Sequence, residues 1–450
     1  MRSSRQESNM KTTKLLHLGI ALLLLPLVAL AGEDATGPGG VLTLQHALQI
    51  AMTDNPGLAQ AGAKARALAE VPSQVGTLPD PVLSLNALNL PTDTYSLSQE
   101  AMTQMQVGIG VTLPFPGKLD LRQQAAGFQA QAAQFGVDET RLVLGRNVRT
   151  TWWNLFYLDR ALAIVSHNQD LLREFVQIAE AKYRTGQGMQ SDVLLAQVEL
   201  SKLLDIGIGL NAARRSQAAV LNALLGRPAN STVLLPRAAD EKLPDAPEFS
   251  ALHDIALQSR PLLSAQRERV QGAQSQVALA EKDYYPDFKV GAAYGYRTGY
   301  NPNGSPRADV ASFTLSMNLP IFSGSKQDHE LAQRKADELD ANYGLQDRLV
   351  QVDSEIEQAL ADYRADREKA LLFKTGIIPQ ASQTTAAMLA AYQVDKVDFL
   401  NLIQAQVTLY NYETQYWKAL SASWQAWARM QAAAGKPLAQ PAADKETKHE

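Results

Sequence analysis

The stretch Gln106–Leu119, QVGIGVTLPFPGKL, decides the fold that this sequence predicts. Its first half alternates apolar residues with polar residues or glycine, and this period of two places one set on each face of a β-strand. Two prolines, which have no N–H to donate to a sheet, and a glycine, which frees the backbone, are expected to end the strand at Pro114, Pro116 and Gly117. A helical pattern covers the next residues, Lys118–Arg184, so the stretch joins a strand to a very long helix.

The first 31 residues have the composition of a secretory signal peptide. Four basic residues precede an apolar run from Leu15 to Ala31, which closes with the small-residue cleavage pattern Ala29-Leu30-Ala31. A membrane anchor is the alternative, but the run is short and Pro26 interrupts it. We therefore expect residues 1–31 to be removed and the mature chain to be exported.

The composition of the remaining chain argues against several classes of protein. It has 38 basic and 45 acidic residues, so nucleic acid is not an expected partner. Cysteine is absent from the whole sequence, which excludes disulfides and a lipidated N-terminus. The mature chain also contains no apolar run long enough for a membrane-spanning helix, so any contact with lipid must be made by strands.

The long helical segment has the pattern of a coiled coil. Apolar residues recur at spacings of three and four between Leu155 and Tyr183. At about 1.5 Å per residue, a continuous helix over Lys118–Arg184 would be roughly 100 Å long. A turn follows, and a second helix is expected from about Ser191 to Gly226.

The chain then repeats the same layout, which is the strongest signal in the sequence. We expect a first structural repeat at 32–228, a connector at 229–247, a second repeat at 248–435 and a disordered tail at 436–450. The four strands are expected at about 82–90, 105–114, 287–297 and 310–320. In the second repeat, Pro320 and Gly324 occupy the place of the prolines and glycine that end the 105–114 strand.

The alternating strands have the length and pattern of strands that span a membrane. Four strands are too few to close a membrane barrel, and an open sheet edge is not tolerated in lipid. The predicted fold is therefore mostly α with a small β part, built from a duplicated helix-strand-strand-long helix-helix unit. Three copies would form a 12-stranded transmembrane β-barrel, and the long helices would continue it as an α-helical barrel. A sheet with one face on a water-soluble core is the alternative.

These features resemble the TolC-like outer-membrane efflux proteins over about residues 40–435. The resemblance rests on the duplicated layout and on Tyr183–Gly186 followed by Asp192–Gln197, which are echoed between Tyr392 and Gln406. Leu78–Pro81 and Pro114–Leu119 are similar to members associated with heavy-metal efflux pumps.

The resemblance implies an exit duct of a tripartite efflux pump, a homotrimer in the outer membrane of a Gram-negative bacterium with a large periplasmic portion. Its partners would be outer-membrane lipid, a periplasmic adaptor protein and an inner-membrane transporter of the RND type, with heavy-metal cations as one candidate cargo. The residues that match the adaptor-docking tips are Arg184, Thr185, Gly186, Val394, Asp395 and Lys396. Those near the periplasmic entrance are Asp192, Asp398, Asn401 and Gln404.

Three of these positions depart from the family pattern. Asp395 stands where the family usually has glycine. Asn401 and Gln404 stand where some members have aspartates that constrict the entrance, which argues against a strongly cation-selective gate.

The junctions between barrel and tunnel are assigned to Pro114, Pro116, Gly117, Pro320 and Gly324. For the tip and entrance residues, an ordinary solvated helix end is the alternative.

No catalytic, cofactor or metal-binding motif is found, and no enzyme activity is expected. The six histidines are scattered, and no HExxH, Walker loop or nucleophile elbow is present. A type I secretion duct shares the predicted architecture and differs only in its partners. A soluble periplasmic coiled-coil adaptor or scaffold is a further alternative, which the strands disfavour because an adaptor has no need of lipid-facing bands.

Overall fold

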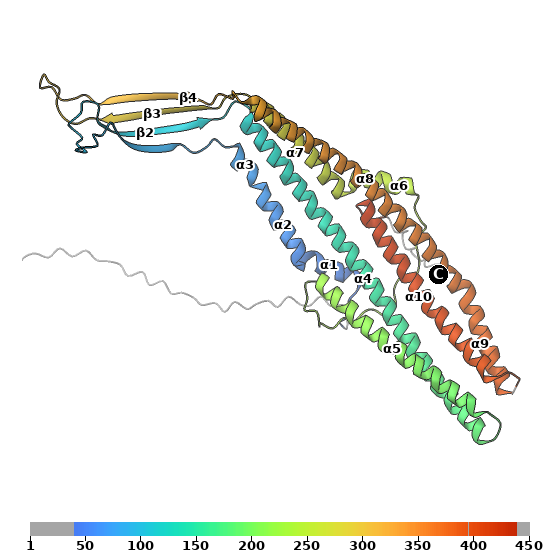
Figure 1. Cartoon of the computed structure of the whole chain (residues 1–450). Coiled ribbons are helices and arrows are strands. Elements are labelled where there is room, and N and C mark those ends of the chain that lie inside the picture. The colour runs from blue at the N-terminus through green and yellow to red at the C-terminus, as the bar shows by residue number, and fades with distance from the viewer. Residues whose placement is uncertain (1–39, 395, 439–450) are drawn as a thin grey trace, which may run out of the picture.

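The computed structural model describes residues 40–394 and 396–438. The expected signal peptide, Asp395 and residues 439–450 of the expected tail lie outside the described residues. Figure 1 shows an elongated molecule, with a β-sheet at one end and two turns between helices at the opposite end. The helices between these ends run side by side along the long axis.

The elements follow the order of two similar units. The helices are α1 (Leu44–Asp54), α2 (Pro56–Ala69), α3 (Val71–Gly76), α4 (Lys118–Arg184), α5 (Gln190–Leu224), α6 (Phe249–Ser259), α7 (Pro261–Lys282), α8 (Gln327–Leu372), α9 (Ile378–Gln393) and α10 (Phe399–Ala434). The strands are β1 (Val82–Leu88), β2 (Gln104–Leu113), β3 (Phe288–Tyr296) and β4 (Val310–Met317). Each unit therefore contributes two strands followed by a long helix, a turn and a further helix.

The four strands form one antiparallel sheet in the order β1-β2-β3-β4. The central pair, β2 and β3, joins the two halves of the sequence, with Val107 opposite Tyr294 and Leu113 opposite Phe288. β1 ends at Leu88 because Asn89 has a φ of 53°, a left-handed conformation that takes the chain out of the sheet. β4 ends at Met317, after which the Asn318 side chain accepts a hydrogen bond from the Asp287 N–H, at 2.6 Å.

The helices form a layer whose central member is the 67-residue α4. α2, α3 and α5 contact one side of α4, whereas α7 and α10 contact the other and separate it from α8. In Figure 1, α3, α2 and α5 follow one another along α4. Two shorter segments thus run alongside one long helix in each half of the chain.

The core lies at the middle of this layer and is rich in aromatic rings. Trp153 of α4 stacks on Trp424 of α10 with ring centroids 5.5 Å apart, and Phe156 is 1% exposed beside them. The Trp152 indole N–H donates to the Leu42 carbonyl oxygen at 3.1 Å. This cluster attaches the N-terminal segment to the two long helices, since buried aromatic residues contribute both area and a polar contact.

Two interruptions in the helices have clear local causes. Asn55 caps α2 through its side-chain oxygen, which accepts from the Leu58 N–H, and Pro56 starts that helix. A π-helical turn at Phe373–Ile377 separates α8 from α9; Gly376 lies in this turn and Pro379 in the first turn of α9. Across the described part of the chain, none of the helices has a stretch that is apolar and long enough to cross a membrane.

A buried lysine fastens the sheet to the helices. Lys118, the first residue of α4, has a side chain that is only 3% exposed. Its ammonium group lies 2.9 Å from Asp287 Oδ1 and 3.0 Å from Asp283 Oδ1. The Phe115 N–H also donates to Asp287 Oδ1 at 2.8 Å, and the Phe115 ring stacks on Tyr285 with centroids 4.5 Å apart. The end of β2 is thereby tied to the segment between α7 and β3.

The electrostatics of Asp287 agree with this arrangement. Partial burial tends to raise the pKa of Asp287, but hydrogen bonds from the Phe115 N–H and from Lys118, with the Lys118 and Arg122 charges, outweigh burial and lower that pKa. The carboxylate is therefore stabilised in its charged form, as a partner of the buried lysine requires.

The two junctions differ in backbone conformation. Gly117 has a φ of 90° and turns the chain directly into α4, so glycine is required there. In the second half the chain passes Pro320 and then forms a short 3-10 turn, Ser323–Ser325, before α8 begins. Gly324 lies inside that turn without a left-handed φ, so its equivalence to Gly117 is one of position and not of conformation.

Replacing Lys118 by methionine is expected to destabilise the junction. The change leaves two carboxylates without their cation, and because these side chains are 28% and 31% exposed the loss should be about 2–3 kcal/mol, below the 3–5 typical of a fully buried pair. Urea unfolding of the detergent-solubilised protein measures this loss in the free energy of unfolding. Lys326→Met, an exposed lysine directly before α8, is the matched control and should change stability by less than about 0.5 kcal/mol. Equal losses in both variants would contradict the role given to Lys118.

Candidate functional site

The sheet has one apolar face and one polar face, and the strand register defines both. Apolar side chains from all four strands share one face, because Leu85 lies opposite Val107, Val107 opposite Tyr294, and Ala292 opposite Phe313. The face comprises Leu83, Leu85, Ala87, Met105, Val107, Ile109, Val111, Leu113, Phe288, Val290, Ala292, Tyr294, Tyr296, Ala311, Phe313, Leu315 and Met317.

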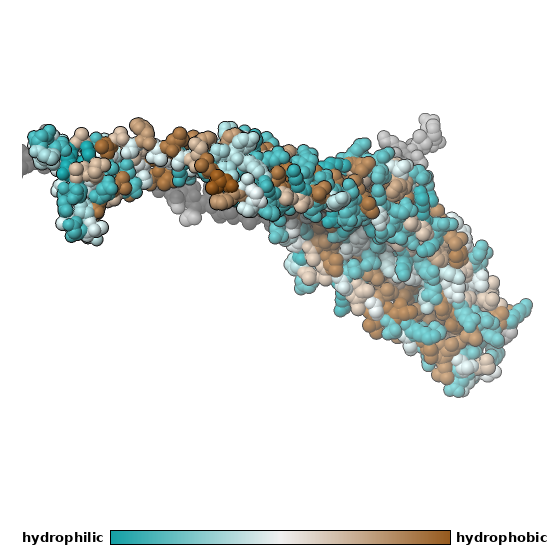
Figure 2. Space-filling model, turned by 45° about the horizontal axis from the view of Figure 1, so that its top comes forward, coloured by the Kyte–Doolittle hydropathy of each residue, from teal (hydrophilic) through white to brown (hydrophobic). Residues whose placement is uncertain are grey.

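This apolar face is largely uncovered. Leu85 is 72%, Phe313 86% and Leu315 67% exposed. Figure 2 shows apolar atoms on the surface of the sheet and close to its junction with the helices. A contiguous apolar surface of this kind marks contact with lipid or with another protein, since water-soluble monomers rarely expose one.

The opposite face carries small and polar side chains. Gly108 and Gly110 of β2 lie beside Ala293 and Gly291 of β3, and glutamine, serine and threonine occupy most of the remaining positions. The close approach there leaves little room: a Cβ added at Gly108 would lie 2.9 Å from Ser84 Oγ. This face of the sheet is therefore mostly polar, and most of its side chains are short.

Both outer strands of the sheet are paired on one side only. Within the described residues, β1 pairs only with β2 and β4 pairs only with β3. The outer N–H and C=O groups of these strands therefore remain available for pairing with another chain.

The first tip is the turn between α4 and α5. Arg184 is exposed, and its guanidinium donates to the Glu180 carbonyl oxygen at 3.4 Å. The Thr185 hydroxyl donates to the Lys182 carbonyl oxygen at 3.0 Å, and Gly186 has a φ of 73° that lets the chain turn back. Arg184 therefore projects its charge from a turn whose backbone is satisfied internally.

The second tip, between α9 and α10, lies beside the first. Val394 is 60% exposed, and Lys396 is exposed with its N–H bonded to the Ala391 carbonyl oxygen at 2.9 Å. A contact that the sequence did not indicate joins the tips: the Lys182 ammonium donates to the Tyr392 carbonyl oxygen at 3.1 Å and lies 4.4 Å from the centroid of its ring. The sequence predicts only that Tyr392 in the second repeat corresponds to Tyr183 in the first; Tyr183 is the residue that follows Lys182.

The structure brings three of the expected entrance residues together. Asp192, Asp398 and Asn401 line one pocket of about 360 Å³ beneath the tips, along with Lys396. Asp192 lies in the first turn of α5 and Asp398 is the residue before α10, so both carboxylates also face helix N-termini, which favour negative charge. Gln404 lines a neighbouring pocket that it shares with Asn401. Arg184, Thr185 and Gly186 line neither pocket.

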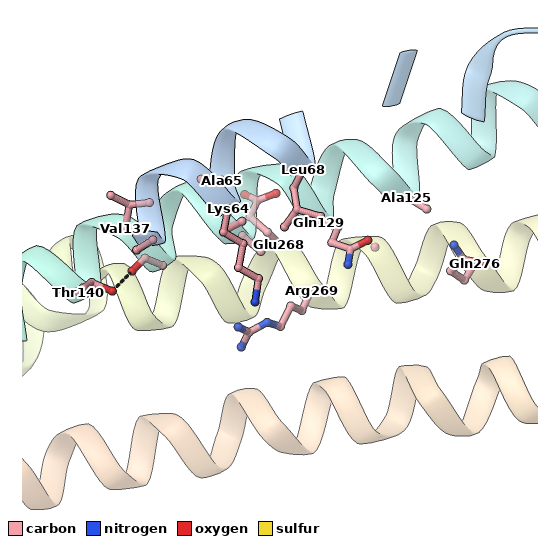
Figure 3. A pocket seen from close by; sticks show the side chains of 15 residues that line it. Lys64, Ala65, Leu68, Ala125, Gln129, Val137, Thr140, Glu268, Arg269 and Gln276 are labelled. Atoms are coloured by element: carbon pink, nitrogen blue, oxygen red, sulfur yellow. Dashed lines mark hydrogen bonds between the residues drawn. The ribbon is translucent and has the colours of Figure 1, made fainter. Parts of the chain in front are cut away.

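A larger pocket lies elsewhere, between α2, α4 and α7. Figure 3 shows Lys64 of α2 and Arg269 of α7 projecting toward the same space, with Gln129 of α4 nearby. The pocket has a volume of about 630 Å³, and much of its wall is alanine and glycine. It contains none of the residues expected at the tips or the entrance.

Clusters of metal-binding side chains are not found in residues 40–394 and 396–438, where no three His, Asp or Glu residues are placed to hold an ion. His253 is paired instead with Asp353, with 2.6 Å between Nδ1 and Oδ1.

Comparison with known proteins agrees with this description. The outer membrane efflux protein family matches residues 47–227 and 252–436, which are the two halves of the chain. The cobalt-zinc-cadmium resistance protein CzcC of Cupriavidus metallidurans is 24% identical over 398 residues, 88% of this chain and 89% of that protein. The alkaline protease secretion protein AprF of Pseudomonas aeruginosa is 22% identical over 266 residues, 58% of this chain and 55% of that protein.

Solved structures share the fold. The outer membrane protein VceC of Vibrio cholerae superimposes with a TM-score of 0.73 at 20% identity, covering 87% of this chain and 96% of that chain. The matched family and these neighbours are channel proteins and not enzymes. The chain therefore belongs to the outer membrane efflux protein family, and it is an exit channel of the outer membrane.

Proposed function

We propose that three copies of this chain form one duct, with a 12-stranded β-barrel in the outer membrane and an α-helical barrel in the periplasm. The observation that carries the proposal is the four-stranded sheet, which has an exposed apolar face and two outer strands that are each paired on one side only within the described residues. Lipid would cover the apolar face, and β4 of one copy would pair with β1 of the next. Closure removes every open edge, as the bilayer requires.

The number of copies follows from the interior that the duct needs. Two copies would give eight strands, and a barrel of about eight strands has an interior filled by its own side chains. Three copies give twelve strands and leave a lumen lined by the polar face. The two structural repeats, 32–228 and 248–435 with a connector at 229–247, would then supply six similar units around the axis.

Exposed apolar residues on the outer helices support lateral contact between copies. Ile208 of α5 is 71% exposed, and Tyr343 and Val350 of α8 are 66% and 67% exposed. α5 and α8 lie on opposite margins of the helical layer, separated by α4, α7 and α10. Contacts between unlike margins generate a ring when the rotation closes.

The tips are proposed to dock on a periplasmic adaptor, through Arg184, Thr185 and Gly186 on one side and Val394, Asp395 and Lys396 on the other. Exposure of Arg184, Val394 and Lys396 supports this role. Asp192 and Asp398 would then surround the entrance together with Asn401 and Gln404. Their shared pockets support that assignment, because the four side chains lie within one region beneath the tips.

The transported substrate is proposed to include divalent metal cations, with an RND-type transporter in the inner membrane as the pump. CzcC, a relative that aligns over 88% of this chain and 89% of its own length, is named as a cobalt-zinc-cadmium resistance protein, which supports a metal cargo. A protein-secretion duct is the second candidate. AprF, named for protease secretion, supports it over a smaller share of the chain.

Detergent-solubilised protein is expected to have the mass of three chains by native mass spectrometry. The reason is that only a closed ring pairs the open edges of β1 and β4 and covers the apolar margins of the helical layer. A monomer recovered from the outer-membrane fraction would contradict the proposed duct.

Arg184→Glu is expected to impair metal resistance while leaving the amount of trimer in the membrane unchanged. Reversal of an exposed charge disturbs an electrostatic contact with a partner but not the internal hydrogen bonds of the turn. Growth in the presence of cobalt, zinc or cadmium measures the effect in a strain that lacks the chromosomal copy. Arg364→Glu, an exposed arginine of α8 away from the tips, is the control for charge reversal. Resistance equal to that of the unaltered protein would refute the docking role.

A further inference from the structure

Lys289 is the one residue with a charged side chain in the four strands, all of which lie within the described residues. It is exposed, and it is the second residue of β3, close to the end of the sheet that meets the helices. A lone charge in an otherwise uncharged sheet needs a reason, because lysine is disfavoured in strands and contributes little to packing there.

The register places Lys289 on the polar face. It lies directly opposite Thr112 of β2 and Ser316 of β4, and its nearest neighbours farther along the face include Gly291 and Thr314. Within the described chain no carboxylate lies within salt-bridge distance of its ammonium group. Asp287, two residues earlier and directly before β3, is instead held by Lys118 at 2.9 Å. The ammonium group of Lys289 therefore has no ion-pair partner among the described residues.

We propose that the Lys289 side chains of the assembled duct form a ring of three positive charges inside the barrel, near its periplasmic end. The ring biases the lumen about twofold toward anions, which reduces the occupancy of cations there but does not block the passage of a metal cargo. The inference rests on the proposed trimeric barrel, in which the polar face lines the lumen. It assigns ion selectivity to the barrel itself, at a position remote from the Asp192 and Asp398 carboxylates of the entrance.

The dimensions of such a barrel make the ring effective across the whole passage. Twelve strands about 4.8 Å apart, tilted by about 40°, give a backbone radius of roughly 12 Å. The four-carbon stem of lysine carries each ammonium inward from the wall, so the charges lie within about one Debye length, ~8–10 Å, of the axis at 0.1–0.15 M salt. The small neighbouring side chains, glycine and threonine among them, do not shield the charge from the lumen.

The test is the ion selectivity of the purified protein in planar lipid bilayers under a tenfold KCl gradient. Lys289→Gln is expected to raise the cation-to-anion permeability ratio about twofold near 0.1 M salt, with a much smaller change near 1 M, where the Debye length is about 3 Å. Lys289→Arg, which keeps the charge, should behave as the unaltered protein. The double variant Thr112→Lys with Lys289→Gln moves the charge to the directly opposite residue of the same face and should restore the original ratio.

The outcomes separate the ring from the duct. A trimeric, conducting Lys289→Gln channel with unchanged selectivity would overturn the ring and leave the duct intact. Failure of the double variant to restore selectivity would also overturn it, because the effect of Lys289→Gln would then come from altered structure and not from charge. A protein that forms no trimer and conducts no ions, with Lys289 in place, would overturn the proposed duct and the ring with it.

Discussion

The contact of the buried Lys118 ammonium with Asp283 and Asp287 is the interaction on which the rest of the structure depends. It forms where β2 becomes α4, and its partners belong to the segment that leads into β3, about 170 residues later. In the proposed duct the apolar face of the sheet contacts lipid and the helices contact water, so the boundary between sheet and helices needs a fixed geometry. A charge pair with an additional N–H donor from Phe115 supplies that geometry, because moving either segment would leave a buried charge unpaired.

The sheet and the helical layer both have apolar side chains that remain exposed in a single chain. Each exposes apolar surface that a single chain cannot cover: the sheet through residues such as Phe313, the helical layer through residues such as Ile208 and Val350. The proposed ring of copies would cover both surfaces at once, with lipid outside the barrel and the polar face of the sheet inside it. The family match fixes the location and the transport role of the chain. The distribution of polar and apolar residues is the reason for proposing that this role requires more than one copy.

Local patterns allowed most of the elements to be predicted from the sequence. The alternation in Gln106–Leu113 and the proline and glycine residues that follow it predict a strand end next to a helix, and the structure has β2 ending at Leu113 and α4 beginning at Lys118. The same patterns contain no information on which distant side chains meet. Lys118 and Asp287 are 169 positions apart, and Lys182 contacts Tyr392 across 210 positions, so neither pair has a spacing that could be recognised. The conformation of Gly324 was also beyond the sequence, because a glycine permits a left-handed turn without requiring one.

Disulfide cross-linking of the outer strands tests the central claim, that β1 of one copy pairs with β4 of the next, most directly. The chain has no cysteine, so pairs can be introduced at Ser84 with Ser312, Thr314 or Ser316. Within one copy, β1 and β4 are three strand spacings apart, roughly 14 Å, which exceeds the ~7 Å that a disulfide can bridge. Oxidation of outer membranes should give covalent dimers and trimers with at least one pair. Membrane-inserted protein that stays monomeric with all three pairs would contradict the account.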